Sequence, residues 1–149
     1  KLEVKSMEEL LELKGFLLSG NISDALLLVE EMTEMSKDDK INKISSYAKI
    51  VILHLIKRAA EKRTTRSWDL SIKHAVNEIQ KTNRRRKAGG KYIADSELFE
   101  TFSEAYPFAL DLAAAEAFGG HYESAELGAM VDRDRVIQEA IALVSGDNV

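Results

Sequence analysis

Apolar residues recur at intervals of three and four positions along most of the chain, which is the spacing of amphipathic α-helices. Residues that break helices are scarce, because the chain has one proline, Pro107, and only eight glycines. The pattern therefore predicts helical segments and no strands. Six such segments are expected to begin near Ser6, Ser23, Ser36, Ser67, Ser96 and Asp132 or Asp134.

The boundaries of the first three segments rest on cap and dipole signals. Ser6 and Glu9 form a capping box, in which each side chain bonds to the backbone N–H of the other residue. Gly20 ends the first segment. The second is expected to end at Met35 and the third to begin at Ser36, since two aspartates then lie in a first turn, where the helix dipole favours negative charge.

The third segment is apolar on nearly every side, which is typical of a helix covered by several neighbours. The chain is therefore expected to form an all-α fold, a single irregular bundle of five or six helices with the third at its centre. We expect one helical domain over residues 1–149. The apolar positions of the third segment are Ile41, Ile44, Ala48, Ile50, Val51, Leu53, Leu55, Ile56 and Ala59.

The later segments carry weaker signals. Pro107 is expected to kink or divide the fifth helix, because proline removes a backbone donor and clashes with the preceding turn. Residues 121–131 are ambiguous, with a short helix as one interpretation. The last segment is expected to bury Ile137, Ala140, Ile141 and Val144.

Composition narrows the possible chemistry. The chain has no cysteine, which excludes a disulfide framework, a thiolate zinc site and a cysteine nucleophile. Its longest strongly apolar run, Ile50 to Ile56, is far shorter than the roughly 20 residues that span a bilayer. We therefore expect a cytoplasmic protein without membrane association and predict no cofactor.

Charge is unevenly distributed along the chain. Residues 57–91 contain twelve Lys or Arg against three acidic residues, which is a net +9, and the remainder is −13. A block of this size indicates an electrostatic partner such as phosphate or an acidic protein. The candidate contacts are Lys62, Arg63, Arg66, Arg84, Arg85, Arg86 and Lys87.

The same basic residues also have a simpler interpretation, as solvated cations that complement the end of a helix dipole. No aromatic residue is interleaved with the arginines, so a platform for stacking single-stranded bases is poorly supported. The basic tract ends a helix instead of opening one, so a helix-turn-helix reader is not evident. Nucleic-acid binding through this segment remains an alternative.

Three histidines are the main candidates for catalysis or metal binding, and none lies in a Glu-x-x-His or His-Glu-x-x-His motif. His54 and His74 could converge on a metal with Glu30 and Glu31, which would make a metal-dependent or hydrolytic enzyme centred on His54. More simply, His54 is a core histidine, hydrogen-bonded to a carboxylate or carbonyl. Trp68 is read either as core packing against the third helix or as an interface anchor.

Four short blocks follow one another in a recognisable order. Glu30-Glu31-Met32 follows an apolar run, then come His54-Leu55-Ile56-Lys57, Ser67-Trp68 and Ser71-Ile72. This order resembles the bacterial family called domain of unknown function 29, whose members show Glu-Glu-Ile, His-Leu-Leu-Lys, Ser-Trp and Thr-Ile. The resemblance covers residues 17–109.

The resemblance implies a compact helical domain and no particular activity. It also indicates six polar or aromatic residues as candidates for a functional site. Alternatively, these residues form an internal polar network that joins the second, third and fourth helical segments. The Arg-rich 81–91 segment and the apolar C-terminal helix depart from the family pattern. The six residues are Glu30, Glu31, His54, Lys57, Ser67 and Trp68.

Taken together, the segregated charge, the absence of catalytic motifs and the additional C-terminal helix favour a non-enzymatic protein-interaction module. Such a module is expected to bind a protein partner or a second copy of itself.

Overall fold

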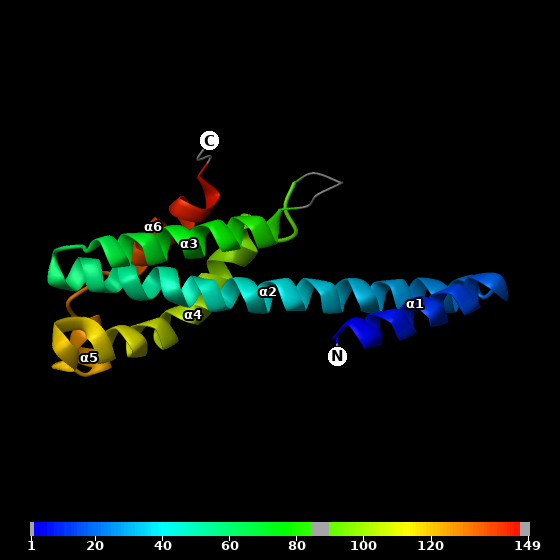
Figure 1. The fold of residues 1–149 in the computed structure, drawn as a ribbon, viewed down its shortest axis with the longest axis horizontal. Helices are drawn as coiled ribbons and strands as arrows, with labels where there is room; N and C mark the ends of the chain where they lie inside the picture. Colours follow the sequence, from blue (N-terminus) through cyan, green and yellow to red (C-terminus); the bar gives the residue numbers. More distant parts are fainter. Residues whose placement is uncertain (1, 85–89, 147–149) are drawn as a thin grey trace. The chain divides into compact units, whose positions relative to one another are not determined.

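The computed structural model describes residues 2–84 and 90–146, with the side chains of residues 2–6 and 35 left aside. Every element in these ranges is helical, which confirms the predicted all-α class (Figure 1). The elements are α1 (Leu2–Leu18), α2 (Ile22–Glu61), α3 (Arg66–Asn83), α4 (Asp95–Glu116), the 3-10 helix η1 (Ala117–Gly120), α5 (Ser124–Gly128) and α6 (Arg133–Ser145).

The predicted break between Met35 and Ser36 is wrong, because α2 is one helix of 40 residues. It contains neither glycine nor proline. Ser36 and the two aspartates after it favour a helix start, but they cost only a few tenths of a kcal/mol each inside a helix, which is too little to end one. The predicted second and third segments are therefore two parts of α2.

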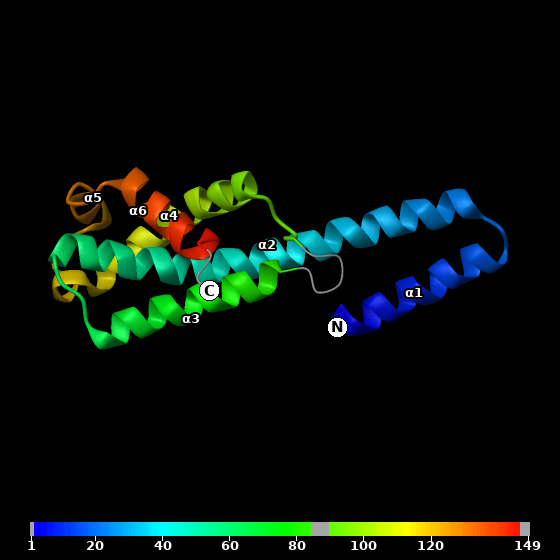
Figure 2. The ribbon, with the colours of Figure 1, turned by 90° about the horizontal axis from the view of Figure 1, so that it is seen from above.

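The chain divides into two compact units, Lys1–Asp39 and Lys40–Val149, each described by itself. In the second unit, α3 runs back alongside the C-terminal part of α2 (Figures 1 and 2), and α6 packs against both α3 and α4. The expectation of one domain over residues 1–149 stays a prediction.

The C-terminal part of α2 lies at the centre of the second unit, as predicted for the third segment. Between Val51 and Lys57 every side chain is buried except His54, which is half-buried, and neighbours cover the helix on several sides. Ile50 and Ala59 are exceptions to the predicted stripes and are exposed. The core around this helix includes Ile79, Ile93, Leu98, Phe102, Leu127 and Ile137.

Several predicted boundaries shift by a few residues. α1 begins at Leu2 instead of Ser6, and the predicted capping box lies outside the described side chains. α3 begins at Arg66 because the Thr65 side chain, and not Ser67, accepts the N–H of the third residue. The remaining three starts agree within one residue: α2 begins at Ile22, α4 begins at Asp95, and α6 follows the cap residue Asp132.

α4 continues through Pro107, so the predicted division of this helix does not occur. Pro107 is exposed, so water can meet the carbonyl that loses its partner, and neighbours packed on the other side hold the helix together. The ambiguous residues 121–131 include the short helix α5. In α6, Ile141 is half-buried where burial was predicted, and Val136 is buried in addition to the predicted residues.

The first unit is a helical hairpin formed by α1 and the start of α2 (Figure 2). The turn uses Gly20 with φ of 79°, a left-handed conformation that glycine adopts without strain. Asn21 follows and its side chain donates to Asp24 at 2.6 Å. Among the described side chains of this unit only Ala25 and Leu28 are buried.

In the part of the chain that the structure describes, no helix combines the length and the apolar character needed to cross a membrane. The predicted cytoplasmic location stays a prediction.

Candidate functional site

Lys57 forms the centre of a polar cluster where α2, α3 and α4 meet. Its ammonium is buried, and it donates to the Glu116 carboxylate at 2.7 Å. The same ammonium lies 4.6 Å from the ring centroid of Trp68, and the Arg63 guanidinium lies 4.7 Å from that centroid. Two cations therefore contact the π-system of one indole, which stabilises them electrostatically. We call these four residues and Glu61 the Lys57 cluster.

Glu61 ties the end of α2 to the turn that follows α4. One carboxylate oxygen accepts from Arg63 Nε at 2.8 Å, and the other accepts from the backbone N–H of Phe118 at 3.0 Å. The Phe118 hydrogen bond and the neighbouring Arg63 hold the pKa of Glu61 below its ordinary value. Phe118 itself has φ of 51°, a left-handed conformation for a non-glycine residue, which this bond helps to maintain.

His54 lies one turn before Lys57 on the same side of α2. Its Nδ1 is buried without a hydrogen-bond partner among the described residues, so the predicted bond to a carboxylate or carbonyl is not found at this atom. Burial lowers the pKa of His54, and the nearby Lys57 ammonium lowers it further, against a smaller opposing effect of Glu116. A neutral His54 next to a buried cation fits a structural role.

Because its pKa is lowered, His54 makes stability depend on pH in a defined direction. The unfolded chain takes up the proton near pH 6.5, and the folded chain only at lower pH. The free energy of unfolding is therefore expected to fall as pH decreases from about 6.5 toward the folded-state pKa. Thermal melts in this window will measure the slope. His54→Gln is expected to reduce this slope, and a slope that the substitution leaves unchanged would contradict the assignment.

The structure brings together only part of the predicted polar group. His54, Lys57 and Trp68 lie in the Lys57 cluster or next to it, and Ser67 is exposed on the first turn of α3. Glu30 and Glu31 are exposed residues of the other unit, so their part in such a network stays a prediction.

Two members of the Lys57 cluster were missed by the sequence analysis. Glu61 follows Lys57 by four positions, which places both on one side of a helix, so this spacing could have identified it. Glu116 comes from a helix whose position only the tertiary structure defines, and no local pattern points to it.

The predicted basic site falls into two groups at opposite ends of α3. Lys62 and Arg66 are exposed at the start, and Arg63 is held in the Lys57 cluster. Arg84 is exposed at the end, about 27 Å away for an 18-residue helix. Arg85, Arg86 and Lys87 lie outside the described residues.

Metal chemistry receives no support from the geometry. Among the side chains of residues 7–34, 36–84 and 90–146, no three His, Asp or Glu are grouped so that they could hold a metal ion. The metal-dependent form of the enzyme alternative centred on His54 therefore has no ligand set among these side chains, and the hydrolytic form stays a prediction.

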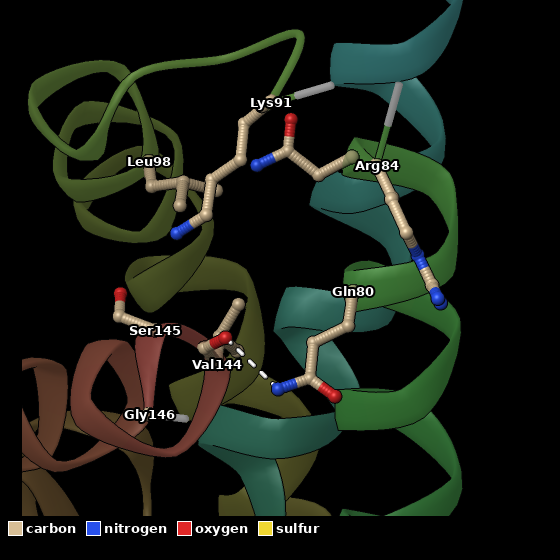
Figure 3. A pocket seen from close by; sticks show the side chains of 9 residues that line it. Gln80, Arg84, Lys91, Leu98, Val144, Ser145 and Gly146 are labelled. Carbon is tan, nitrogen blue, oxygen red and sulfur yellow. Dashed lines mark hydrogen bonds between the residues drawn. The ribbon is translucent and has the colours of Figure 1, made fainter. Parts of the chain in front are cut away.

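Two hollows follow one another along a single face of α3. The larger, of about 660 Å³, is lined by Lys73, His74, Asn77 and Leu143 among others, and the smaller, of about 250 Å³, by Arg84, Lys91 and Leu98. Both are lined by Gln80, whose amide donates to the Val144 carbonyl of α6 at 3.0 Å (Figure 3).

Comparison with known proteins identifies the family. The family model described as Domain of unknown function DUF29 matches residues 21–123, which confirms the predicted resemblance. No curated protein and no solved structure matches the chain. The matched region contains the Lys57 cluster and both basic groups, and it stops before α6. Because the match covers more than half of the sequence, the chain belongs to the DUF29 family.

Proposed function

We propose that this protein is a non-enzymatic protein-interaction module that self-associates through its N-terminal hairpin. The observation that carries the proposal is the exposure of large apolar side chains on both helices of the hairpin, from 42% for Val29 to 79% for Leu18. We call the exposed residues on one side of the hairpin the hairpin face; Leu27 of α2, which is 58% exposed, lies on another side of its helix and is not part of it. It consists of Met7, Leu10, Leu11, Leu17 and Leu18 of α1 and Ile22, Leu26 and Val29 of α2.

Helical geometry supports a single continuous face. At 100° per residue, the α1 members span about 120° of the helix, interrupted by Lys14, and the α2 members span about 60°. The middle of each stripe follows the inward residue of its helix, Phe16 in α1 and Leu28 in α2, by about 160° and about 130° in the winding direction. Because the two helices run antiparallel, these similar offsets put both stripes on the same side of the hairpin.

A second copy of the chain is the occupant that we propose for this face. Among its described side chains this two-helix unit has two buried apolar residues, which do not form a core, and a second hairpin would supply the other half of a four-helix bundle. The eight side chains expose roughly 500–800 Å² per copy, so a two-fold pair would bury about 1,000–1,600 Å², within the range of stable dimers. Two-fold pairing is also the commonest symmetry of soluble oligomers.

Sedimentation velocity will test this assignment. Wild type is expected to sediment as a dimer, and Leu11→Glu with Leu26→Glu is expected to weaken association at least about tenfold, because each places a carboxylate in an apolar interface. Both positions are exposed, so the monomer should keep its helicity and melting temperature. Leu112→Glu, at an exposed apolar residue of α4, is the matched control. A monomeric wild type, or equal weakening by the control, would contradict the proposal.

The salt dependence of dimerisation tests whether apolar contacts or opposite charges hold the two copies together. Residues 1–39 contain ten acidic and four basic residues, a net charge of −6, so two hairpins repel each other weakly around their apolar face. Dimerisation is therefore expected to strengthen between about 0.05 and 0.5 M salt, as screening removes this repulsion. Weakening with salt would instead mean that opposite charges of the two copies attract each other across the dimer interface.

A further inference from the structure

The residues of α3 that line the two hollows recur at helical spacing, so they lie on one face of the helix. Lys73, Asn77, Gln80 and Arg84 are separated by four, three and four residues, so they form one row along the helix. The lining continues from Asp69 to Arg84, a length of about 22 Å. The C-terminal end of α6 supplies the facing wall through Leu143, Val144 and Ser145, and Gln80 crosses between the walls. We call this feature the α3 groove.

The α3 groove combines an apolar floor with a basic rim. Ile72 and Val76 line the larger hollow, and Leu98 and Val144 line the smaller one; all four are buried core residues whose edges form its base. Three cations, Lys73, Arg84 and Lys91, line it against one carboxylate, that of Asp69, and the exposed Lys91 ammonium also lies 3.7 Å from the Asp95 carboxylate. In Figure 3, Lys91 extends over the smaller hollow near Leu98, and Arg84 is turned away from Ser145.

From this arrangement we propose that the α3 groove binds an acidic protein segment that also carries apolar side chains. Apolar residues of the segment occupy the two hollows on either side of Gln80, and its carboxylates meet Lys73 and Lys91. The length of the groove matches about four turns of helix. This surface belongs to the Lys40–Val149 unit and is independent of the hairpin face.

The cations of the α3 groove favour an acidic partner. The aliphatic residues at its base favour a protein over a nucleic acid. Phosphate backbones are bound by cations and backbone amides, with bases stacked on aromatic rings. The lining of the two hollows includes His74 but no Phe, Tyr or Trp, and its deepest part is aliphatic. Aliphatic hollows spaced along a helix are instead suited to side chains that recur at helical intervals.

Fluorescence anisotropy with a defined probe will test the proposal. The probe is a labelled helical peptide of about 14 glutamate and leucine residues, with leucines at helical spacing, and the comparators are its glutamine counterpart and a single-stranded RNA of the same length. Wild type is expected to bind the acidic peptide saturably and about tenfold or more tightly than the glutamine peptide, with affinity that decreases as salt increases.

Variants of the groove and a matched charge control complete the test. Lys73→Glu with Lys91→Glu is expected to weaken binding at least about tenfold, and Lys43→Glu with Lys62→Glu, at exposed positions outside the groove, less than about threefold. Asn77→Trp fills the larger hollow without changing charge and is also expected to weaken binding about tenfold. Circular dichroism of each variant establishes that it is folded.

Three outcomes would overturn the inference: absence of peptide binding by wild type, equal effects of both charge-reversal pairs, or tighter binding of the RNA than of the acidic peptide. The last result would make nucleic-acid binding the function of the basic segment. The hairpin variant Leu11→Glu with Leu26→Glu should bind the peptide as wild type does, so failure of self-association and failure of the groove are distinguishable.

Discussion

Lys57→Glu is expected to lower the free energy of unfolding by about 3–5 kcal/mol, the typical cost of leaving a buried charge without its partner. The residue is only 6% exposed, and its ammonium lies 2.7 Å from the Glu116 carboxylate. The substitution would place two carboxylates together and would turn an attractive contact with the Trp68 ring into a repulsive one. Urea denaturation followed by circular dichroism will measure the change in midpoint.

Lys57→Met is the matched control, because it keeps a side chain of similar length and removes the charge. The Glu116 side chain is 49% exposed, so it can be hydrated once its partner is gone. We expect a loss of about 1 kcal/mol or less. If Lys57→Met loses as much unfolding free energy as Lys57→Glu, the ion pair itself stabilises the fold strongly. That result would contradict the assignment of the Lys57→Glu effect to an unpaired buried charge.

Asn83→Ala is expected to destabilise the protein by about 2–4 kcal/mol, because it leaves two buried backbone groups without partners. The Asn83 amide donates to the Ile93 carbonyl at 3.2 Å and accepts the Ile93 N–H at 2.8 Å. Asn83 is 3% exposed and Ile93 is fully buried, so water cannot replace the lost bonds. These bonds hold together the two ends of the chain segment that carries the predicted basic residues 85–87.

Amide hydrogen exchange will measure the effect of Asn83→Ala at the Ile93 N–H itself. The Ile93 N–H is expected to exchange faster in Asn83→Ala by more than the change in global stability requires, because its acceptor has been removed. Asn83→Asp keeps that acceptor and loses only the donor to the Ile93 carbonyl, so it should protect the Ile93 N–H better than alanine does. Equal Ile93 exchange in wild type and Asn83→Ala would contradict the assigned role.

The helical class and most helix starts could be predicted because they depend on local chemistry. Periodic apolar residues and caps such as Asp132 act within one or two turns, so they can be read directly from the chain. The errors have a common physical origin. Ser36 carries the same local signal as a true cap, and Pro107 the same signal as a true break, but each costs too little to overcome the packing of its helix.

Part of the candidate site could be predicted from the order of short blocks that resembles the DUF29 family. This order singled out His54, Lys57 and Trp68, and the structure brings Lys57 and Trp68 into contact. The partner of Lys57 comes from α4, 59 positions later, and neither its identity nor its distance is encoded in any local pattern. The separation of the basic residues to both ends of α3 likewise depends on where that helix begins and ends.

Local periodicity and composition alone thus establish an all-α chain with a central apolar helix, no cysteine chemistry and a segregated charge. Only the tertiary structure decides which apolar residues are buried. Leu98 and Leu11 are both leucines at apolar positions of predicted helices, yet Leu98 is fully buried and Leu11 is 64% exposed. The physical reason is that burial depends on which helices pack against each other, and the hairpin of the first unit is too small to cover its own apolar side chains. The hairpin face and the α3 groove therefore could not be found before the helices were placed.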